Sequence, residues 1–295
     1  LVEMQQGTGA YDIYAVDVMW LAEYATAGFL EPLMPLVRNE DLTDPDYDID
    51  DFLPRVISGT GVWDDVLYTI PLGAGPVGTT FRRDVAEEAG ITMPERFSPE
   101  FTTDFMHEAA AKVHNPESGM MGFAQMPGRW FWGITYLPYL YAFQTPETVG
   151  DEYVDEDWNI TINNERTIES IDYFVSFREF MPADSANWGI DEATSMYQSG
   201  RAFGLWNYQD FIKGFFEDED AHPEIAGQNV HLHTPAGPHG VIDPWFGAWS
   251  LAISRDSSKK DATWVLIQWL TSKEGEAWHA AKLGVFPARK STLAS

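Results

Sequence analysis

The chain has 295 residues, of which 46 are acidic and 18 basic, so its formal net charge is −28 at pH 7. A charge of this sign argues against a surface for phosphate groups, and nucleic acid is not expected as a partner. The absence of cysteine excludes disulfides, thiolate metal sites and thiol nucleophiles. The longest apolar stretches, 249–254 and 263–270, are too short to span a bilayer.

Strands and helices are predicted to alternate along the first third of the chain. Residues 11–16 predict a strand that runs into Asp17, and the helix that follows should end at Gly28, a residue suited to a left-handed cap. A second strand is predicted at 68–72, before a Gly- and Pro-rich link at 73–78. A link of this kind between apolar strands is where the chain could pass from one lobe to another.

The middle of the chain carries two helix start signals, at Ser98 and at Asn164, because both residue types are favoured N-caps. A strand is predicted at 202–206. Residues 221–244 are rich in Pro, Gly and His and predict a loop with one short strand at 230–233. The alternation of helices with short strands predicts an α/β protein with mainly parallel sheets.

The C-terminal part predicts a strand at 249–254, a helix at 260–270, and a second helix at 273–282 that ends before Gly284. In the first of these helices the apolar spacing predicts an inward face. Its expected members are Ala262, Val265, Leu266 and Trp269. The tryptophans on these two helices, Trp264, Trp269 and Trp278, are accordingly predicted to be core residues.

Candidate catalytic and metal sites are few. His231 and His233 alternate along a predicted strand and could share a face with His239 nearby, but the surrounding Pro and Gly favour an exposed loop over a metal site. The glycines of 73–78 resemble a dinucleotide motif in spacing only, because Pro76 and a strand replace the helix start that the motif requires. With 46 acids, carboxylate pairs for glycoside hydrolysis arise by chance.

The informative pattern is the position of the aromatic residues. Many lie in predicted loops or at strand ends: Trp20, Trp130, Trp132, Tyr136, Trp206, Tyr208, Trp245, Phe246 and Trp249. Carboxylates and amides lie beside them: Asp17, Asn207, Asp210 and Asp243. The C–H face of a sugar ring stacks on an aromatic ring while carboxylates and amides take its hydroxyls, so these residues together predict a sugar site.

One resemblance covers nearly the whole chain. The residues 12–17, Trp20 and 23–33 resemble the family 1 extracellular solute-binding proteins of sugar ABC transporters, of which maltose-binding protein is a distant relative. The likeness continues in further segments: 68–71, 81–84, 88–94, 197–202, 247–254, 262–274 and 284–289.

This resemblance implies a two-lobed periplasmic-binding-protein fold of type II that closes on a ligand by hinge motion. The first lobe is expected to comprise 1–75 and 247–283, and the second 76–246 and 284–295. Compared with the family, the chain is expected to be truncated at both ends, lacking a strand-helix unit of the first lobe and C-terminal helices of the second.

The resemblance also implies which positions face the ligand. These are Asp17, Trp20, Gly75, Trp130, Trp132, Trp206, Tyr208, Trp245, Phe246, Trp249 and Arg289. At the first crossing the side chains are only Gly, Ala, Pro and Val, so hydrogen bonds there would have to come from the backbone.

The expected function is therefore the substrate-binding component of an ABC uptake transporter, which captures a monosaccharide, oligosaccharide or polyol. Its expected partners are that ligand and a membrane permease, and it is expected to be a monomer that needs no cofactor and catalyses no reaction. It should be periplasmic or extracellular, with a lipid anchor through a segment absent from this chain as one alternative. Two other hypotheses remain open, a binding protein for a cationic or metal-chelate ligand and a glycan-active enzyme.

Overall fold

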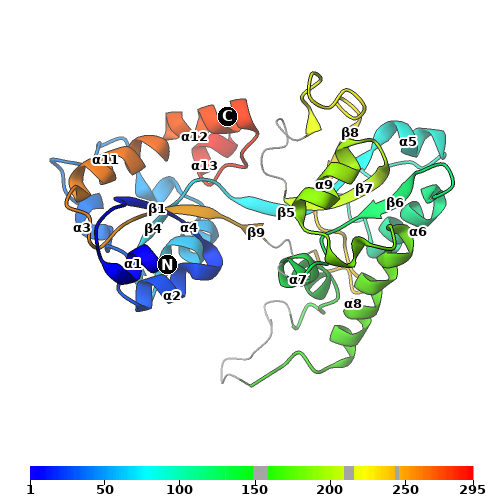
Figure 1. Cartoon of the computed structure of the whole chain (residues 1–295), viewed down its shortest axis with the longest axis horizontal. Helices are drawn as coiled ribbons and strands as arrows, with labels where there is room; N and C mark the ends of the chain where they lie inside the picture. Colours follow the sequence, from blue (N-terminus) through cyan, green and yellow to red (C-terminus); the bar gives the residue numbers. More distant parts are fainter. Residues whose placement is uncertain (130, 149–158, 209–215, 243–245, 295) are drawn as a thin grey trace. The chain divides into compact units, whose positions relative to one another are not determined.

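The computed structural model describes residues 1–129, 131–148, 159–208, 216–242 and 246–294 (Figure 1). The chain divides into two compact units. Unit 1 comprises Leu1–Gly75 and Phe246–Ser295, and unit 2 comprises Pro76–Trp245. Within the described residues, no helix is long and apolar enough to cross a membrane.

The sheet of unit 1 consists of β1 (Ile13–Asp17), β10 (Trp249–Ile253) and β4 (Thr69–Pro71), in that order. The central strand β10 is antiparallel to both of its neighbours. Its first residue, Trp249, lies opposite Asp17, the last residue of β1. The register therefore brings these two residues to one end of the sheet.

Helices and a small hairpin complete unit 1. They are α1 (Val2–Gln6), η1 (Val18–Trp20), α2 (Leu21–Thr26), α3 (Met34–Val37), η2 (Ile49–Asp51), α4 (Pro54–Gly61), β2 (Val62–Trp63), β3 (Val66–Leu67), α11 (Lys260–Leu270), α12 (Lys273–Leu283) and α13 (Lys290–Leu293). The two-residue strand β9 (Phe246–Gly247) precedes β10 in the chain. The predicted end of α2 is confirmed, since Gly28 has φ 73°. The buried core includes Trp264, Ile267 and Leu251.

The predicted inward face of α11 is wrong. Trp264 and Ile267 are buried, whereas Val265, Leu266 and Trp269 are exposed. The indole of Trp264 packs edge-on against the ring of Tyr47, and its Nε1 donates to Thr43 Oγ1 at 2.8 Å. Because α11 has apolar residues on both faces, the spacing of these residues does not determine which face is buried. The buried face is the one on which an indole N–H finds a hydrogen-bond partner.

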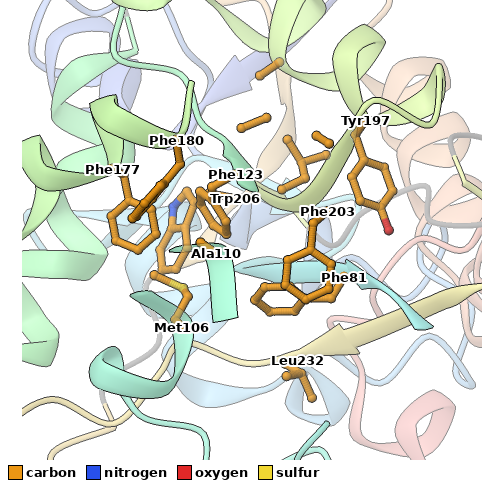
Figure 2. Close-up of a cluster of buried hydrophobic side chains, with 14 of the residues drawn as sticks. Phe81, Met106, Ala110, Phe123, Phe177, Phe180, Tyr197, Phe203, Trp206 and Leu232 are labelled. Carbon is orange, nitrogen blue, oxygen red and sulfur yellow. The ribbon is translucent and has the colours of Figure 1, made fainter. Parts of the chain in front are cut away.

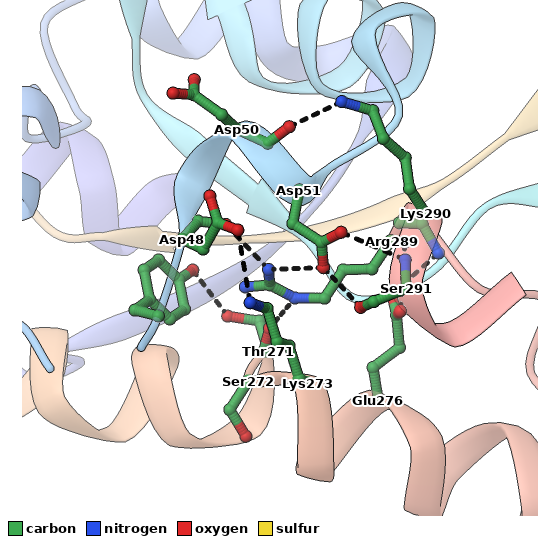
Figure 3. Close-up of polar contacts among 12 residues, drawn as sticks. Asp48, Asp50, Asp51, Thr271, Ser272, Lys273, Glu276, Arg289, Lys290 and Ser291 are labelled. Carbon is green, nitrogen blue, oxygen red and sulfur yellow. Dashed lines mark hydrogen bonds and ion pairs between the residues drawn. The ribbon is translucent and has the colours of Figure 1, made fainter. Parts of the chain in front are cut away.

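The C-terminal segment is held in unit 1 by Arg289, which is fully buried (Figure 3). Its guanidinium lies 3.9 Å from the ring centre of Phe52, and its Nε donates to Thr271 O at 2.8 Å. The carboxylate of Glu276 accepts the backbone N–H of Arg289 at 3.0 Å. The prediction that 284–295 belongs to the second lobe is therefore wrong, because this segment takes its polar partners from unit 1.

The sheet of unit 2 is built on β5 (Gly75–Arg82), which lies between β7 (Ala202–Tyr208) and β8 (Asn229–Leu232) and is antiparallel to both. Strand β6 (Met121–Ala124) adds to β7 in parallel. The α/β class is as predicted, but mainly parallel pairing is not. Strands β5 and β10 begin at or near the points where the chain changes units, and both run against their neighbours.

The helices of unit 2 are α5 (Arg83–Glu88), α6 (Thr103–Val113), α7 (Trp132–Ala142), α8 (Glu165–Ser176) and α9 (Ile190–Gln198), with the short turns η3 (Phe177–Phe180) and η4 (Ser185–Asn187). Asn164 is confirmed as an N-cap, since its Oδ1 accepts from Thr167 N at 3.0 Å. The helix expected from Ser98 begins later, where Thr102 Oγ1 accepts from Phe105 N at 3.1 Å.

An aromatic core fills unit 2 (Figure 2). The ring of Phe81 packs against those of Phe123 and Phe203, and the rings of Phe81 and Phe123 lie over Gly204 on β7. A Cβ at Gly204 would lie 2.6 Å from the ring of Phe123 and 2.8 Å from that of Phe81. Glycine at this position therefore lets the phenylalanines close over the sheet.

Candidate functional site

The most open aromatic group among the described residues of the unit 1 sheet lies where β1 ends and β10 begins. The carboxylate of Asp17 accepts the backbone N–H of Met19 at 3.1 Å and thereby caps η1, whose last residue is Trp20. The indoles of Trp20 and Trp249 meet edge to face, with ring centres 5.7 Å apart and an interplanar angle of 77°. They remain 39% and 48% exposed. Asp17, Trp20 and Trp249 are called the indole corner below.

The chemistry of the indole corner combines apolar ring surface with one acceptor group. Partial burial raises the pKa of Asp17, and its hydrogen bond from Met19 offsets part of that rise. The exposed indole faces can stack on C–H groups, while the carboxylate can accept hydroxyl hydrogens. Such an arrangement suits a polyhydroxylated ligand.

Two further aromatic residues of unit 1 extend this region and were missed from the sequence. The ring of Tyr24 on α2 lies 6.1 Å from that of Trp20. The exposed Trp63 donates from Nε1 to Thr26 Oγ1 at 3.0 Å, which ties β2 to the end of α2. Asp64 and Asp65, which follow, have left-handed backbone conformations and form the turn of the hairpin. An Asp-Asp pair favours a turn, so the sequence did contain a signal for a hairpin that carries Trp63.

Among the predicted site residues of unit 2 whose side chains the structure describes, Trp132 is the one that remains exposed. Its ring stacks on that of Tyr136 one turn later, with centres 5.1 Å apart and an angle of 18°. Tyr136 is buried and is held by a 2.7 Å hydrogen bond between its hydroxyl and Ser170 Oγ. The stack therefore fixes the exposed indole at the start of α7.

Trp206 does not meet the expectation of a ligand-facing residue. It is fully buried, and its ring stacks on Tyr139 with centres 4.8 Å apart. Strand β7 lies inside the sheet, and Trp206 points to the side that helices cover, so an aromatic near a strand end was mistaken for a surface group. Its Nε1 has no hydrogen-bond partner among the described residues.

The other predicted positions are placed as follows. Gly75 is buried at the start of β5, and Tyr208 is the last residue of β7. Phe246, expected in the second lobe, instead packs against the core of unit 1. Arg289 is enclosed by Phe52 and Tyr47 and cannot reach a ligand from there. The remaining positions lie outside the described residues: Trp130, Asp210, Asp243 and Trp245.

Two of the three histidines considered as metal ligands bind protein groups. His231 Nδ1 lies 3.0 Å from Thr80 Oγ1 and its Nε2 3.3 Å from Glu217, while His233 Nδ1 accepts from the backbone of Phe97. Burial lowers the pKa of both rings. Within the described part of the chain, no three His, Asp or Glu side chains are placed to hold a metal ion.

Comparison with known proteins identifies the family. Residues 1–277 match the model of the bacterial extracellular solute-binding proteins. The chain belongs to this family.

The curated relatives include the mannitol-binding protein of Pseudomonas aeruginosa, which is 26% identical over 288 residues, covering 97% of this chain and 62% of the relative. The erythritol/L-threitol-binding protein of Mycolicibacterium smegmatis is 22% identical, covering 99% of this chain and 61% of the relative. The chain thus spans less than two thirds of the length of these relatives.

Solved structures of solute-binding proteins share the fold. One from Agrobacterium vitis S4 with bound D-mannitol is 26% identical with a TM-score of 0.79, covering all of this chain and 68% of that one. Maltose-bound MalE3 of T. maritima is 23% identical with a TM-score of 0.84, covering all of this chain and 70% of that one. The expected periplasmic-binding-protein fold is confirmed.

Proposed function

We propose that this chain captures a carbohydrate, with acyclic polyols as the leading class, for uptake by an ABC transporter. The relatives support this proposal through what they bind. Relatives from different bacteria are named for mannitol and for erythritol or L-threitol, and solved neighbours hold D-mannitol and ribitol. Other neighbours hold maltose and α-D-tagatose, so cyclic sugars stay within the proposal.

The observation that carries the proposal is the indole corner. Trp20 and Trp249 offer exposed indole surface on two rings that meet edge to face, next to the carboxylate of Asp17. Large aromatic side chains left half exposed beside an acceptor are unusual for a structural site, where they would be buried. A chain of hydroxyl-bearing carbons can place C–H groups against an indole and a hydroxyl against the carboxylate.

The proposed mechanism is capture without chemistry. The family is one of transport proteins, and the ligand would be bound and released with no bond made or broken. The indole corner would supply the ring surface and the carboxylate for this capture. The loaded chain would be the form that a membrane permease receives outside the cytoplasm.

The alternative of a cationic ligand in this site depends on carboxylates that converge on it. Of the three carboxylates first considered, Asp17 alone lies within the described residues, and burial disfavours its charged form. The indole corner therefore favours a neutral hydroxylated ligand over a cation.

The test is a thermal-shift screen with mannitol, ribitol, erythritol and maltose, followed by calorimetry on the ligand that stabilises most. A ligand that binds only the folded chain raises its melting temperature with concentration. Trp249→Ala should weaken binding about tenfold, since stacking on one indole is worth roughly 1 kcal/mol or somewhat more.

Trp278→Ala is the matched control, because it removes an exposed indole of unit 1 on α12, outside the indole corner. It should leave the affinity unchanged. A polyol or sugar that binds equally well to Trp20→Ala, Trp249→Ala and the unaltered chain would refute the site, and no thermal shift with any carbohydrate would refute the function.

A further inference from the structure

Two tryptophans of unit 1 that were predicted to be core residues are exposed, so that prediction is wrong for both. Trp269, near the end of α11, is 68% exposed, and Trp278, on α12, is 55% exposed. The core of unit 1 is already filled by Trp264. Neither of the exposed indoles belongs to the indole corner, so the proposed carbohydrate site does not account for them.

The turn between α11 and α12 brings the two indoles to a shared surface. Ser272 caps α12 by accepting the backbone N–H of Gly275 at 3.0 Å. Glycine is required there, because a Cβ would lie 2.6 Å from the carbonyl oxygen of Trp269. The first turn of α12 therefore presses directly against the end of α11 and fixes the angle between the two helices (Figure 1).

One turn further along α12, Glu274 and Trp278 are four residues apart and so share a face of the helix. The neighbouring Lys273 is engaged by Asp48 at 3.2 Å. Among the described residues, by contrast, the carboxylate of Glu274 has neither an ion-pair nor a hydrogen-bond partner. An exposed, unpaired carboxylate thus lies beside an exposed indole.

These side chains line one hollow of about 210 Å³. Its lining consists of Trp269, Leu270, Glu274, Gly275, Trp278 and His279. A second hollow of about 390 Å³ adjoins it and shares Trp269 and Glu274. The smaller hollow is walled by two indoles, by the imidazole of His279, which meets Trp278 edge to face, and by the aliphatic side chain of Leu270, and it holds a single carboxylate.

This combination selects among ligand chemistries. A compact metal ion needs several oxygen ligands converging on one point, which the described residues do not provide. A sugar needs several hydrogen-bonding partners, whereas this hollow offers mainly ring surface. A bulky organic cation needs aromatic faces for its diffuse charge and one carboxylate nearby, and both are present.

We propose that the hollow between Trp269 and Trp278 binds a quaternary ammonium group, with Glu274 as its counter-charge. The two indoles would contact the methyl groups of the cation, and the carboxylate would balance its charge at the rim. The formal charge of −28 would raise the local concentration of any cation at low ionic strength. This site is independent of the carbohydrate site in both its residues and its ligand.

Tetramethylammonium chloride and choline chloride are the probes, titrated against the whole chain while tryptophan fluorescence is recorded. Potassium chloride at equal concentration is the control for ionic strength. We expect a saturable change with a dissociation constant on the order of millimolar, as is usual for a small, partly exposed site.

Matched variants locate the site. Trp278→Ala and Glu274→Gln should each weaken choline binding at least fivefold, since one removes a wall and the other the counter-charge. Lys282→Ala, an exposed change on the same helix, and Trp20→Ala should leave it unchanged. Both altered side chains are exposed, so each variant should fold normally. Circular dichroism and thermal melting check this.

The same head group could come from a free cation or from a lipid surface. Sedimentation with phosphatidylcholine vesicles, with phosphatidylglycerol vesicles as the control, separates these sources. Loss of phosphatidylcholine binding in Trp278→Ala would assign the lipid source, and choline binding without vesicle binding would assign the free cation. A response to choline that matches potassium chloride, or that survives in both variants, would overturn the proposal.

Discussion

In unit 1 the indoles of Trp20 and Trp249 meet edge to face and stay about half exposed, whereas in unit 2 the indole of Trp206 lies flat on Tyr139 and is fully buried. All three were expected at ligand-facing positions by the same criterion, an aromatic residue at or near the end of a strand. Trp249 is the first residue of a strand and lies at the end of its sheet. Trp206 lies inside a strand that has neighbours on both sides.

The difference teaches that a strand-end aromatic faces solvent only where no helix covers that side of the sheet. The face of β7 that carries Trp206 is covered by α7, through Tyr139, and by the aromatic residues of η3 (Figure 2). The indole of Trp249 meets only Trp20 among the ring contacts of the described residues. Whether an indole at a strand end is buried in the core or exposed to a ligand therefore depends on the helices that pack on its side of the sheet.

The largest expected effect is that of Trp206→Ala. Removing a fully buried indole stacked on Tyr139 leaves a large cavity, and the free energy of unfolding should fall by about 3 to 5 kcal/mol. Denaturant unfolding measures this change.

Trp206→Phe keeps a ring on Tyr139 and should cost clearly less. A small loss of stability in Trp206→Ala, together with weaker ligand binding, would contradict this interpretation. Trp206 would then be a ligand-binding residue and not a core residue.

Arg289→Ala should destabilise unit 1 by about 3 kcal/mol, because it empties a fully buried site and removes the guanidinium that donates to Thr271 O, to Asp48 O and to the carboxylate of Asp51. Urea unfolding of this variant is compared with that of Lys290→Ala. The side chain of Lys290 is exposed, so Lys290→Ala should lower the free energy of unfolding by less than about 0.5 kcal/mol.

Ligand affinity measured on the folded fraction of Arg289→Ala should equal that of the unaltered chain. A specific loss of affinity with normal stability would mean that Arg289 reaches the ligand after all.

The edge-to-face contact in the indole corner should be worth about 0.5 to 1.5 kcal/mol to the folded chain. A double-mutant cycle with Trp20→Ala, Trp249→Ala and both together isolates this coupling in unfolding experiments. Additive losses would show that the rings are held by the backbone alone and do not support each other.

The smallest expected effects are changes in stability with pH, which should have opposite signs for two aspartates of unit 1, Asp51 and Asp17. Burial acts to raise the pKa of Asp51, but hydrogen bonds from Ser291 and Arg289 outweigh it and lower that pKa below 3.8. The stability that Asp51 contributes is therefore present above pH 3.8 and is lost as the pH falls through its folded value.

Asp17 has the opposite sign, since burial raises its pKa. Its contribution to stability declines as the pH rises from 3.8 through its folded value, because the folded state then binds more protons than the unfolded one. Urea unfolding of Asp51→Asn and Asp17→Asn between pH 2.5 and 6 should show these opposite changes in slope. Equal slopes would mean that the two carboxylates share one kind of environment.

Much of the fold followed from local sequence. The caps at Asn164 and Gly28 are set by short-range geometry, and the helices 260–270 and 273–282 were placed almost to the residue. The direction of strand pairing was not predictable in this way. Strands β5 and β10 pair with segments more than one hundred residues away, and no local pattern states which way two distant strands run.

Part of the candidate site also followed from sequence. Asp17, Trp20 and Trp249 were selected as residue types that suit sugars, and the register of β1 and β10 brings them together. Trp206 and Arg289 were selected by the same reasoning but are enclosed by their own units. The chemistry of a side chain is local, whereas its access to a ligand depends on everything packed around it.

The sequence by itself determined the acidic, cysteine-free composition, the order of helices and strands, and the residue types available for a ligand. Tertiary structure alone decided which face of α11 is buried, which indoles remain in contact with solvent, and where the C-terminal segment packs. The reason is that apolar residues occur on more than one face of these elements. Which face is buried depends on which residues pack best in the single core of the unit. In α11 this is the face of Trp264, whose indole N–H also bonds to Thr43.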